Sequence, residues 1–126
     1  MIDPQPPKSL KYLTEILHGW KQTYPHNRQG VLLFQNKRLN SNVLFTDEAF
    51  HRIQNHSRGF DLIPQAIEKP DEVWSQWGDD KQRATLRNYL LFGKICYVVQ
   101  TKDGSITDAF TCTPRQANKY RRGAII

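Results

Sequence analysis

Four strand-like runs follow one another in the second half of this chain, over residues 73–77, 86–92, 94–101 and 105–111. Asp103-Gly104, between the last two runs, is a strong signal for a tight hairpin turn. Strands joined by such short connections pair with their sequence neighbours. The pattern therefore predicts a four-stranded antiparallel β-meander.

Helical patterns and two short strands fill the first half of the chain. Apolar residues between Leu10 and Trp20 recur at the spacing of one helical face, and Ser9 can cap that helix. Tyr24-Pro25 ends it, because the residue before proline avoids the helical region. A buried strand over 31–34, a turn and a second strand ending near residue 45 are predicted next.

A second helix is predicted over residues 47–55, since Thr46 supplies a capping hydroxyl and two acidic residues follow it. A short helical turn over 62–67 comes before the strands, and Pro114 opens a C-terminal helix over 115–121. We therefore expect an α+β fold in which N-terminal helices pack on the four-stranded antiparallel meander, with a short C-terminal helix.

Charge is distributed unevenly along the 126 residues, which are enough for one domain, 1–126. Residues 1–60 carry eight basic and four acidic side chains, residues 61–84 three and six, and residues 85–126 seven and two. The net charge of +6 suits a polyanionic partner such as nucleic acid. If the two basic ends meet in the fold they form one basic face; otherwise the charge is spread over a solvated surface.

Only two cysteines occur, Cys96 and Cys112, each within a β-like run. Their spacing fits no zinc motif, so we expect buried thiols on neighbouring strands, no metal site and no cofactor. No stretch reaches the roughly 18 apolar residues of a membrane span, and no signal sequence opens the chain. We expect a soluble protein without a membrane partner, although the chain could be a piece of a larger one.

RNA can be cut without a metal, because its own 2′-hydroxyl is the nucleophile. The protein must supply a base for that hydroxyl, an acid for the leaving 5′-oxygen, and cations or donors for the charge on phosphate. Histidine titrates nearest to neutral pH. His51 and His56 lie around the end of the second predicted helix. Each is a candidate base or an ordinary surface or capping residue.

Two further groups could contact a phosphate. Arg87 alternates with Tyr89 along a predicted strand, so both share one sheet face, and an arginine there can bind phosphate bidentately or simply lie in solvent. Thr111 and Thr113 are two positions apart at the end of the last strand, with Arg115 just beyond. Their hydroxyls could donate to phosphate, but threonine is also a common strand and helix-cap residue.

The C-terminal segment 115–122 combines cations with one aromatic residue and no acid: Arg115, Lys119, Tyr120, Arg121 and Arg122. Such a segment can bind a phosphate backbone while the tyrosine stacks on a base or donates to phosphate. A solvated terminal helix is the alternative interpretation.

Several segments together resemble the barnase/EndoU/colicin/RelE-like nuclease domains of phages and polymorphic, contact-dependent toxins. The resemblance is strongest over residues 45–123. It rests on the segment from Phe50 to His56, on Leu62-Ile63-Pro64, on Pro70-Asp71-Glu72-Val73-Trp74, and on Thr111-Cys112-Thr113-Pro114 after the strands. The Pro-Asp-Glu-Val-Trp segment is its most specific part.

The resemblance implies a metal-independent endoribonuclease that forms a cyclic phosphate. It would place the family's helix histidine at His56 or His51, its basic strand residue at Arg87 and its C-terminal hydroxyl at Thr111 or Thr113. It also implies a toxin acting on tRNA or other RNA in the cytoplasm of the producing or target cell.

We expect such a toxin to be a monomer when free, to be delivered as part of a secreted protein, and to have an acidic immunity protein as partner. We expect the histidine, the guanidinium and the late hydroxyls to converge on one phosphate. Two other classes of function stay open. One is a non-catalytic nucleic-acid-binding module, and the other is a phage or secretion interaction domain.

Overall fold

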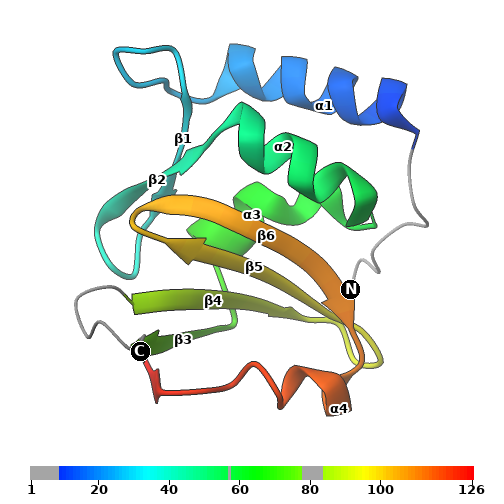
Figure 1. Ribbon diagram of the computed structural model, residues 1–126, viewed down its shortest axis with the longest axis vertical. Helices are drawn as coiled ribbons and strands as arrows, with labels where there is room; N and C mark the ends of the chain where they lie inside the picture. The colour runs from blue at the N-terminus through cyan, green and yellow to red at the C-terminus, as the bar shows by residue number, and fades with distance from the viewer. Residues whose placement is uncertain (1–8, 57, 78–83) are drawn as a thin grey trace.

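The structure, a computed structural model, describes residues 9–56, 58–77 and 84–126, without the side chain of His56 (Figure 1). The helices are α1 (Leu10–Thr23), α2 (Asp47–Ile53), α3 (Ile63–Glu68) and α4 (Pro114–Ala117), with 3-10 turns η1 (Gln54–His56) and η2 (Phe60–Leu62). The strands are β1 (Leu32–Asn36), β2 (Ser41–Phe45), β3 (Glu72–Trp77), β4 (Ala84–Leu91), β5 (Cys96–Lys102), β6 (Ser105–Cys112) and β7 (Ala124–Ile125). None of the helices in the described ranges is long and apolar enough to cross a membrane.

The helix starts predicted from the sequence are confirmed by their caps. The Ser9 hydroxyl accepts a hydrogen bond from the Tyr12 amide at 3.2 Å, and the Thr46 hydroxyl accepts one from the Ala49 amide at 3.1 Å. Thr113 accepts from the Gln116 amide at 3.2 Å, while the Gln116 side chain accepts from the Thr113 amide at 2.9 Å. Each cap satisfies amides that a helix start leaves without partners.

Seven strands form one mixed sheet in the order β1-β2-β6-β5-β4-β3-β7. The predicted meander is its centre, because β3 to β6 pair antiparallel in sequence order. The four-stranded prediction is wrong at both sides of that centre. The β1–β2 hairpin joins β6 through a parallel pair, Leu44 opposite Ser105, and β7 pairs with β3 where Ile125 lies opposite Trp74. Both pairings join segments far apart in sequence, which local patterns do not reveal.

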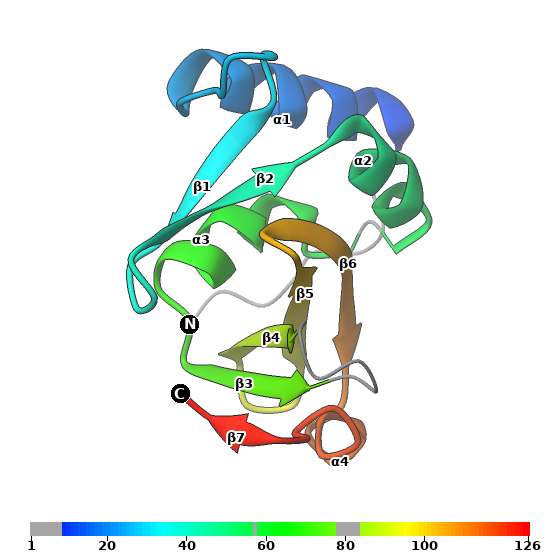
Figure 2. The same cartoon turned by 60° about the vertical axis from the view of Figure 1, so that its left-hand side comes forward.

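The helices of the first half cover one face of the sheet. Figure 2 shows α2 and α3 above strands β3 to β6 and α4 below them. α2 packs on β6, and α3 packs on β1, β4 and β5. Trp20 of α1 stacks on Phe60 with ring centroids 4.9 Å apart and meets Phe34 edge-on at 5.5 Å. Trp20 belongs to the core, since only 8% of it is exposed.

The other face of the meander packs against α4. Tyr89, Val98 and Ala117 form a buried cluster there with Cys96, and the Tyr89 hydroxyl donates to the Ala117 carbonyl at 3.1 Å. Cys96 lies directly opposite Cys112, and both are free thiols on neighbouring strands, as predicted. Cys96 is buried, but Cys112 is only half-buried, so the predicted burial is wrong for Cys112. Burial raises the pKa of both thiols, that of Cys112 to about 11.

The prediction of a helix over 115–121 is wrong in length, because α4 ends at Ala117. The amides of Lys119 and Tyr120 bond to carbonyls only three residues back, which tightens the turn. Gly123, at φ +85°, then admits the chain against β3, where β7 pairs. The residues after Ala117 therefore do not continue the helix, and the chain ends instead in the edge strand β7.

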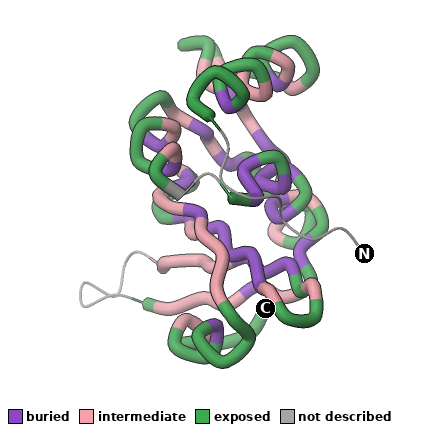
Figure 3. Tube along the Cα trace, turned by 90° about the vertical axis from the view of Figure 1, so that its right-hand side faces the viewer, coloured by how far each residue is buried: buried purple, intermediate pink, exposed green. Residues whose placement is uncertain are grey.

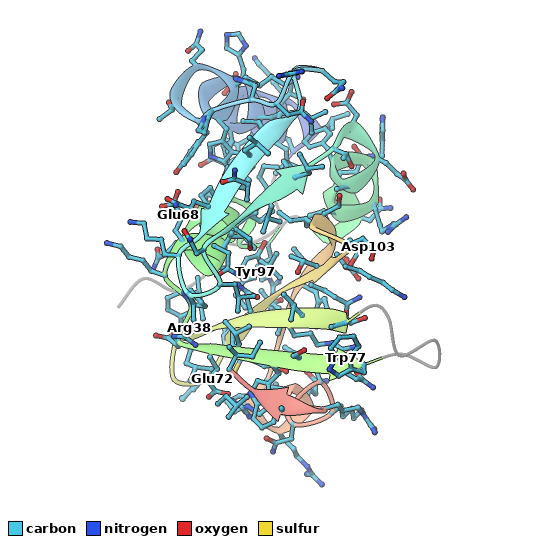
Figure 4. The ribbon with its side chains drawn as sticks, turned by 90° about the vertical axis from the view of Figure 1, so that its left-hand side faces the viewer. Arg38, Glu68, Glu72, Trp77, Tyr97 and Asp103 are labelled. Atoms are coloured by element: carbon cyan, nitrogen blue, oxygen red, sulfur yellow. The ribbon has the colours of Figure 1, made fainter. Side chains whose placement is uncertain are left out.

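Within the described residues, Arg38 from the basic first half of the chain contacts the end of the chain. The Arg38 guanidinium donates to the carbonyls of Pro70 at 3.1 Å and Ile126 at 3.3 Å. Figure 4 shows Arg38 beside the end of β3 that carries Glu72. These two hydrogen bonds connect the turn between β1 and β2 to the segment before β3 and to the end of the chain.

Candidate functional site

Arg87 lies in the middle of β4, and its face is the one predicted from the sequence. Tyr89, two residues on, packs in the cluster under α4, so that face is the one opposite α2 and α3. Trp74 on β3 and Gln100 on β5 flank Arg87 as its direct cross-strand neighbours. The adjoining stretches of β3 (74–76) and β4 (84–87) are half-buried, as Figure 3 shows, so Arg87 is neither in the core nor free in solvent.

Two amide side chains hold the Arg87 guanidinium. Its Nε donates to Oε1 of Gln100 at 3.0 Å, and its Nη1 donates to Oε1 of Gln76 at 2.6 Å. The ring of Tyr120 lies with its centroid 5.8 Å from the guanidinium carbon, within the range of a cation–π contact. A guanidinium has five N–H groups, so three remain without an acceptor among the described residues.

The charge of Arg87 has no carboxylate partner within the described ranges. The two ion pairs recorded there join Arg52 to Glu48 and Arg121 to Glu72. Burial lowers the pKa of Arg87, and the nearby charge of Arg122 lowers it further. Arginine still remains protonated near neutral pH, since its pKa begins so high. The site is therefore a half-buried cation that attracts anions.

A chain of hydrogen bonds connects this site to α2. The Gln100 amide nitrogen donates to the Thr107 hydroxyl at 3.3 Å, and that hydroxyl donates to the Gln100 carbonyl at 3.2 Å. The Arg52 guanidinium of α2 donates to the Thr107 carbonyl at 3.0 Å. Thr107 lies where the β5–β6 register shifts, so its side chain can face Gln100.

The two candidate histidines lie at the end of α2 and just beyond it. His51 is exposed, with its ring centroid 6.3 Å from that of Phe50. His56 is the last residue of η1, a turn that contacts β6, but its side chain is outside the described part of the structure. The role of either as a base stays a prediction.

Thr111 and Thr113 line one pocket of about 200 Å³ with Arg58 and Gln116. Cys112, which lies between the two threonines, also lines this pocket. Sequence reasoning missed Arg58, which the chain brings in from the turn after η1.

Arg87 and Thr111 do not converge, so the expectation of one shared phosphate is wrong for this pair. Arg87 lies opposite Gln100 on β5, whereas Thr111 lies opposite Tyr97 on the same strand. Positions three apart along a strand face opposite sides of the sheet. Tyr97 is fully buried between the sheet and the helices (Figure 4), which confirms that Thr111 belongs to the helix-covered side.

The C-terminal cations divide into two groups. Arg121 binds Glu72 through Nε at 2.8 Å and Nη2 at 3.2 Å, so the fold already uses its charge. Arg115, Lys119 and Arg122 are exposed.

Tyr120 links this segment to the candidate site. Its ring lies 4.9 Å from that of Phe110 and also faces Arg87. The sequence did not predict the part that three residues play in this site: Gln76, Gln100 and Thr107. Alternation along a strand indicates which face each side chain occupies, but not that the side chains meet.

Comparison with known proteins adds the family. Neither a curated protein nor a solved structure matches the chain. Residues 19–126, which include the meander, Arg87 and the C-terminal segment, match the family described as phage-Barnase-EndoU-ColicinE5/D-RelE like nuclease2. With most of its length matched, the chain belongs to the phage-Barnase-EndoU-ColicinE5/D-RelE like nuclease family.

Proposed function

We propose that this nuclease-family protein is an endoribonuclease in which Arg87 binds the phosphate that is cut. One observation carries the proposal: a half-buried guanidinium is held by two neutral amides, and three of its N–H groups have no acceptor among the described residues. Such a group is suited to stabilising the charge that develops on phosphate oxygens in the transition state.

The proposed reaction is a transesterification. A base takes the proton of the 2′-hydroxyl, the 2′-oxygen bonds to phosphorus, and the 5′-oxygen leaves with a proton from an acid, so that a 2′,3′-cyclic phosphate remains. His51 and His56 are the proposed base and acid, in either order. α2 covers the opposite face of the sheet from Arg87, so either histidine would have to reach the phosphate around β6. The hydrogen bond from Arg52 of α2 to the Thr107 carbonyl holds α2 against this strand, next to Gln100.

The exposed cations of the C-terminal segment support substrate binding. Arg115, Lys119 and Arg122 are exposed, and Tyr120 contacts Arg87 from the same segment. Cations in this arrangement can follow an RNA backbone on either side of the cut.

The proposal extends to a toxin domain that cuts tRNA in the cytoplasm of the producing or target cell. Its partner would be an acidic immunity protein, because complementary charge speeds association. A monomeric free chain without a bound metal completes the proposal.

The test is incubation of the purified protein with total tRNA in excess EDTA, followed by analysis of the fragment ends. We expect cyclic phosphate ends from the wild type. Arg87→Ala should lower the rate by about 100-fold or more, the scale of a lost charge stabiliser. Arg28→Ala is the control, because Arg28 is an exposed arginine in the turn between α1 and β1.

Arg87→Lys separates bidentate binding from charge alone. Lysine keeps the charge but not the planar fork, so we expect most of the rate loss to persist. An undiminished rate in Arg87→Ala would contradict the assignment. Salt-sensitive RNA binding without cleavage of any RNA tested would indicate a binding module instead.

A further inference from the structure

The contacts of Arg87 point to two residues that act through it. We propose that Gln100 and Gln76 are positioning residues, which fix the Arg87 guanidinium with uncharged acceptors and so leave its charge and three N–H groups to the substrate phosphate. This inference rests on the proposed function and names how the same site is built.

The two amides hold the guanidinium at two of its three nitrogens. Nε bonds to Gln100 on one neighbouring strand and Nη1 to Gln76 on the other, so Nη2 bonds to no described residue. A planar group held at two corners has a fixed orientation. The third corner, with one hydrogen of Nη1, can then bind phosphate oxygens.

The direction of the Gln100 amide follows from its own contacts. The Thr107 hydroxyl gives its single proton to the Gln100 backbone carbonyl at 3.2 Å, so its oxygen is an acceptor toward the side chain. The Gln100 nitrogen occupies that position at 3.3 Å. Its Oε1 must therefore face Arg87, and Thr107 fixes which end of the amide does so.

Arg121, in the same molecule, shows the opposite arrangement. Its Nε and Nη2 both bind the carboxylate of Glu72, and this hydrogen bond raises the pKa of Arg121. Burial lowers the pKa of Arg87 instead, and none of the described residues gives it a carboxylate partner. A carboxylate neutralises a structural arginine, whereas amides position an arginine and leave its charge available.

The decisive variant is Gln100→Glu, which keeps the shape of the side chain and adds a carboxylate beside Arg87. The probe is a 2′-O-methyl RNA oligonucleotide, which cannot be cut, so binding is measured apart from cleavage. We expect at least tenfold weaker binding. The slope of log affinity against log salt should fall by about 0.7, which corresponds to the loss of one phosphate contact on a single strand. Gln65→Glu is the matched control, because Gln65 is exposed on α3.

Gln100→Leu tests orientation without a change of charge. Arg87 then keeps its charge but loses one of its two fixed corners, so we expect kcat on tRNA to fall at least tenfold while KM changes less than threefold. Equal binding by Gln100→Glu and Gln65→Glu, with Arg87→Ala still impaired, would overturn this inference and leave the proposed function standing. Equal binding by the wild type and Arg87→Ala would overturn both.

Discussion

The Glu72 carboxylate is held in place by hydrogen bonds from two side chains. Its Oε1 accepts from Arg121 at 2.8 Å and from the Trp74 indole at 2.9 Å. The hydrogen bond from Arg121 holds the pKa of Glu72 below its usual value, with help from Trp74 and against the effect of burial. A carboxylate of the acidic stretch 61–84 and an arginine of the basic C-terminal segment are thus joined in one structural contact.

This contact predicts a dependence of stability on pH. A carboxyl with a lowered folded pKa contributes stability above its unfolded pKa, about 4.3 for Glu, and loses that contribution as pH falls through the folded value. We expect Glu72→Gln to lower the free energy of unfolding by roughly 1–2 kcal/mol at pH 7. The difference from wild type should shrink toward pH 3 in urea titrations. A difference that is equal at both pH values would contradict the role of the charge.

At the level of residues, the sequence predicted orientation better than contact. Alternation along a strand placed Arg87 on the face that it occupies, because that rule needs only local geometry. The amides of Gln76 and Gln100 reach Arg87 from two other strands, so their meeting depends on register. The same dependence made the expected meeting of Arg87 and Thr111 wrong.

Among the elements, β7 depends on one glycine. A Cβ on Gly123 would lie 1.9 Å from the Ser75 carbonyl oxygen, and the φ of +85° is unfavourable for other residues. The amide of Ile126 donates to the Val73 carbonyl at 2.8 Å and closes the pairing. The edge strand therefore requires close backbone approach at this position.

Gly123→Ala should detach β7 and lower stability by roughly 1–3 kcal/mol, from strain and the lost pairing. Thermal unfolding measures the loss, and hydrogen exchange at the Ile126 amide should lose its protection. Gly30→Ala is the matched control, because Gly30 has a φ of +78° but nothing within 4 Å of a Cβ. An equal effect of both substitutions would mean that strain alone, and not the approach to Ser75, is responsible.

Most elements could be predicted because their signals are local. Capping hydroxyls at Ser9 and Thr46, the proline after Tyr24 and the Asp103-Gly104 turn each act within a few residues. The end of α4 could not be predicted, since it depends on the pairing of β7 with β3. The ends of a helix or strand can be predicted from the sequence where side chains at or near those ends fix them.

On the scale of the whole molecule, exposed cations lie near both ends of its length. Figure 1 shows α1 and α4 at opposite ends, and the exposed cations Lys119 and Arg122 follow α4. Arg122 also lies close enough for its charge to lower the pKa of Arg87. If RNA binds across this end, these residues contribute and those near α1 do not.

The double variant Lys119→Ala/Arg122→Ala tests this asymmetry. Each phosphate contact to a single strand contributes about 0.7 to the slope of log affinity against log salt, so the slope should fall by about 1.4. Lys21→Ala/Arg28→Ala removes the same charge near α1 and should leave the slope nearly unchanged. Equal slopes in the two double variants would indicate a nonspecific effect of net charge.

The α+β class and the meander could be predicted for the whole molecule, but not the seven-stranded sheet. The additional strands join the meander where Leu44 of β2 pairs with Ser105 and where Ile125 of β7 pairs with Trp74, and neither contact leaves a periodic signal in the sequence. Closing such long loops is a matter of global packing.

The facing thiols of Cys96 and Cys112 have one more consequence. The thiolate is the form that reacts with oxidants, and at a pKa of about 11 only on the order of one in ten thousand Cys112 side chains is ionised at neutral pH. Chemical cross-linking of the pair is therefore slow although the strands hold them opposite each other. We therefore expect the protein to form this disulfide only slowly when it moves from reducing to oxidising surroundings.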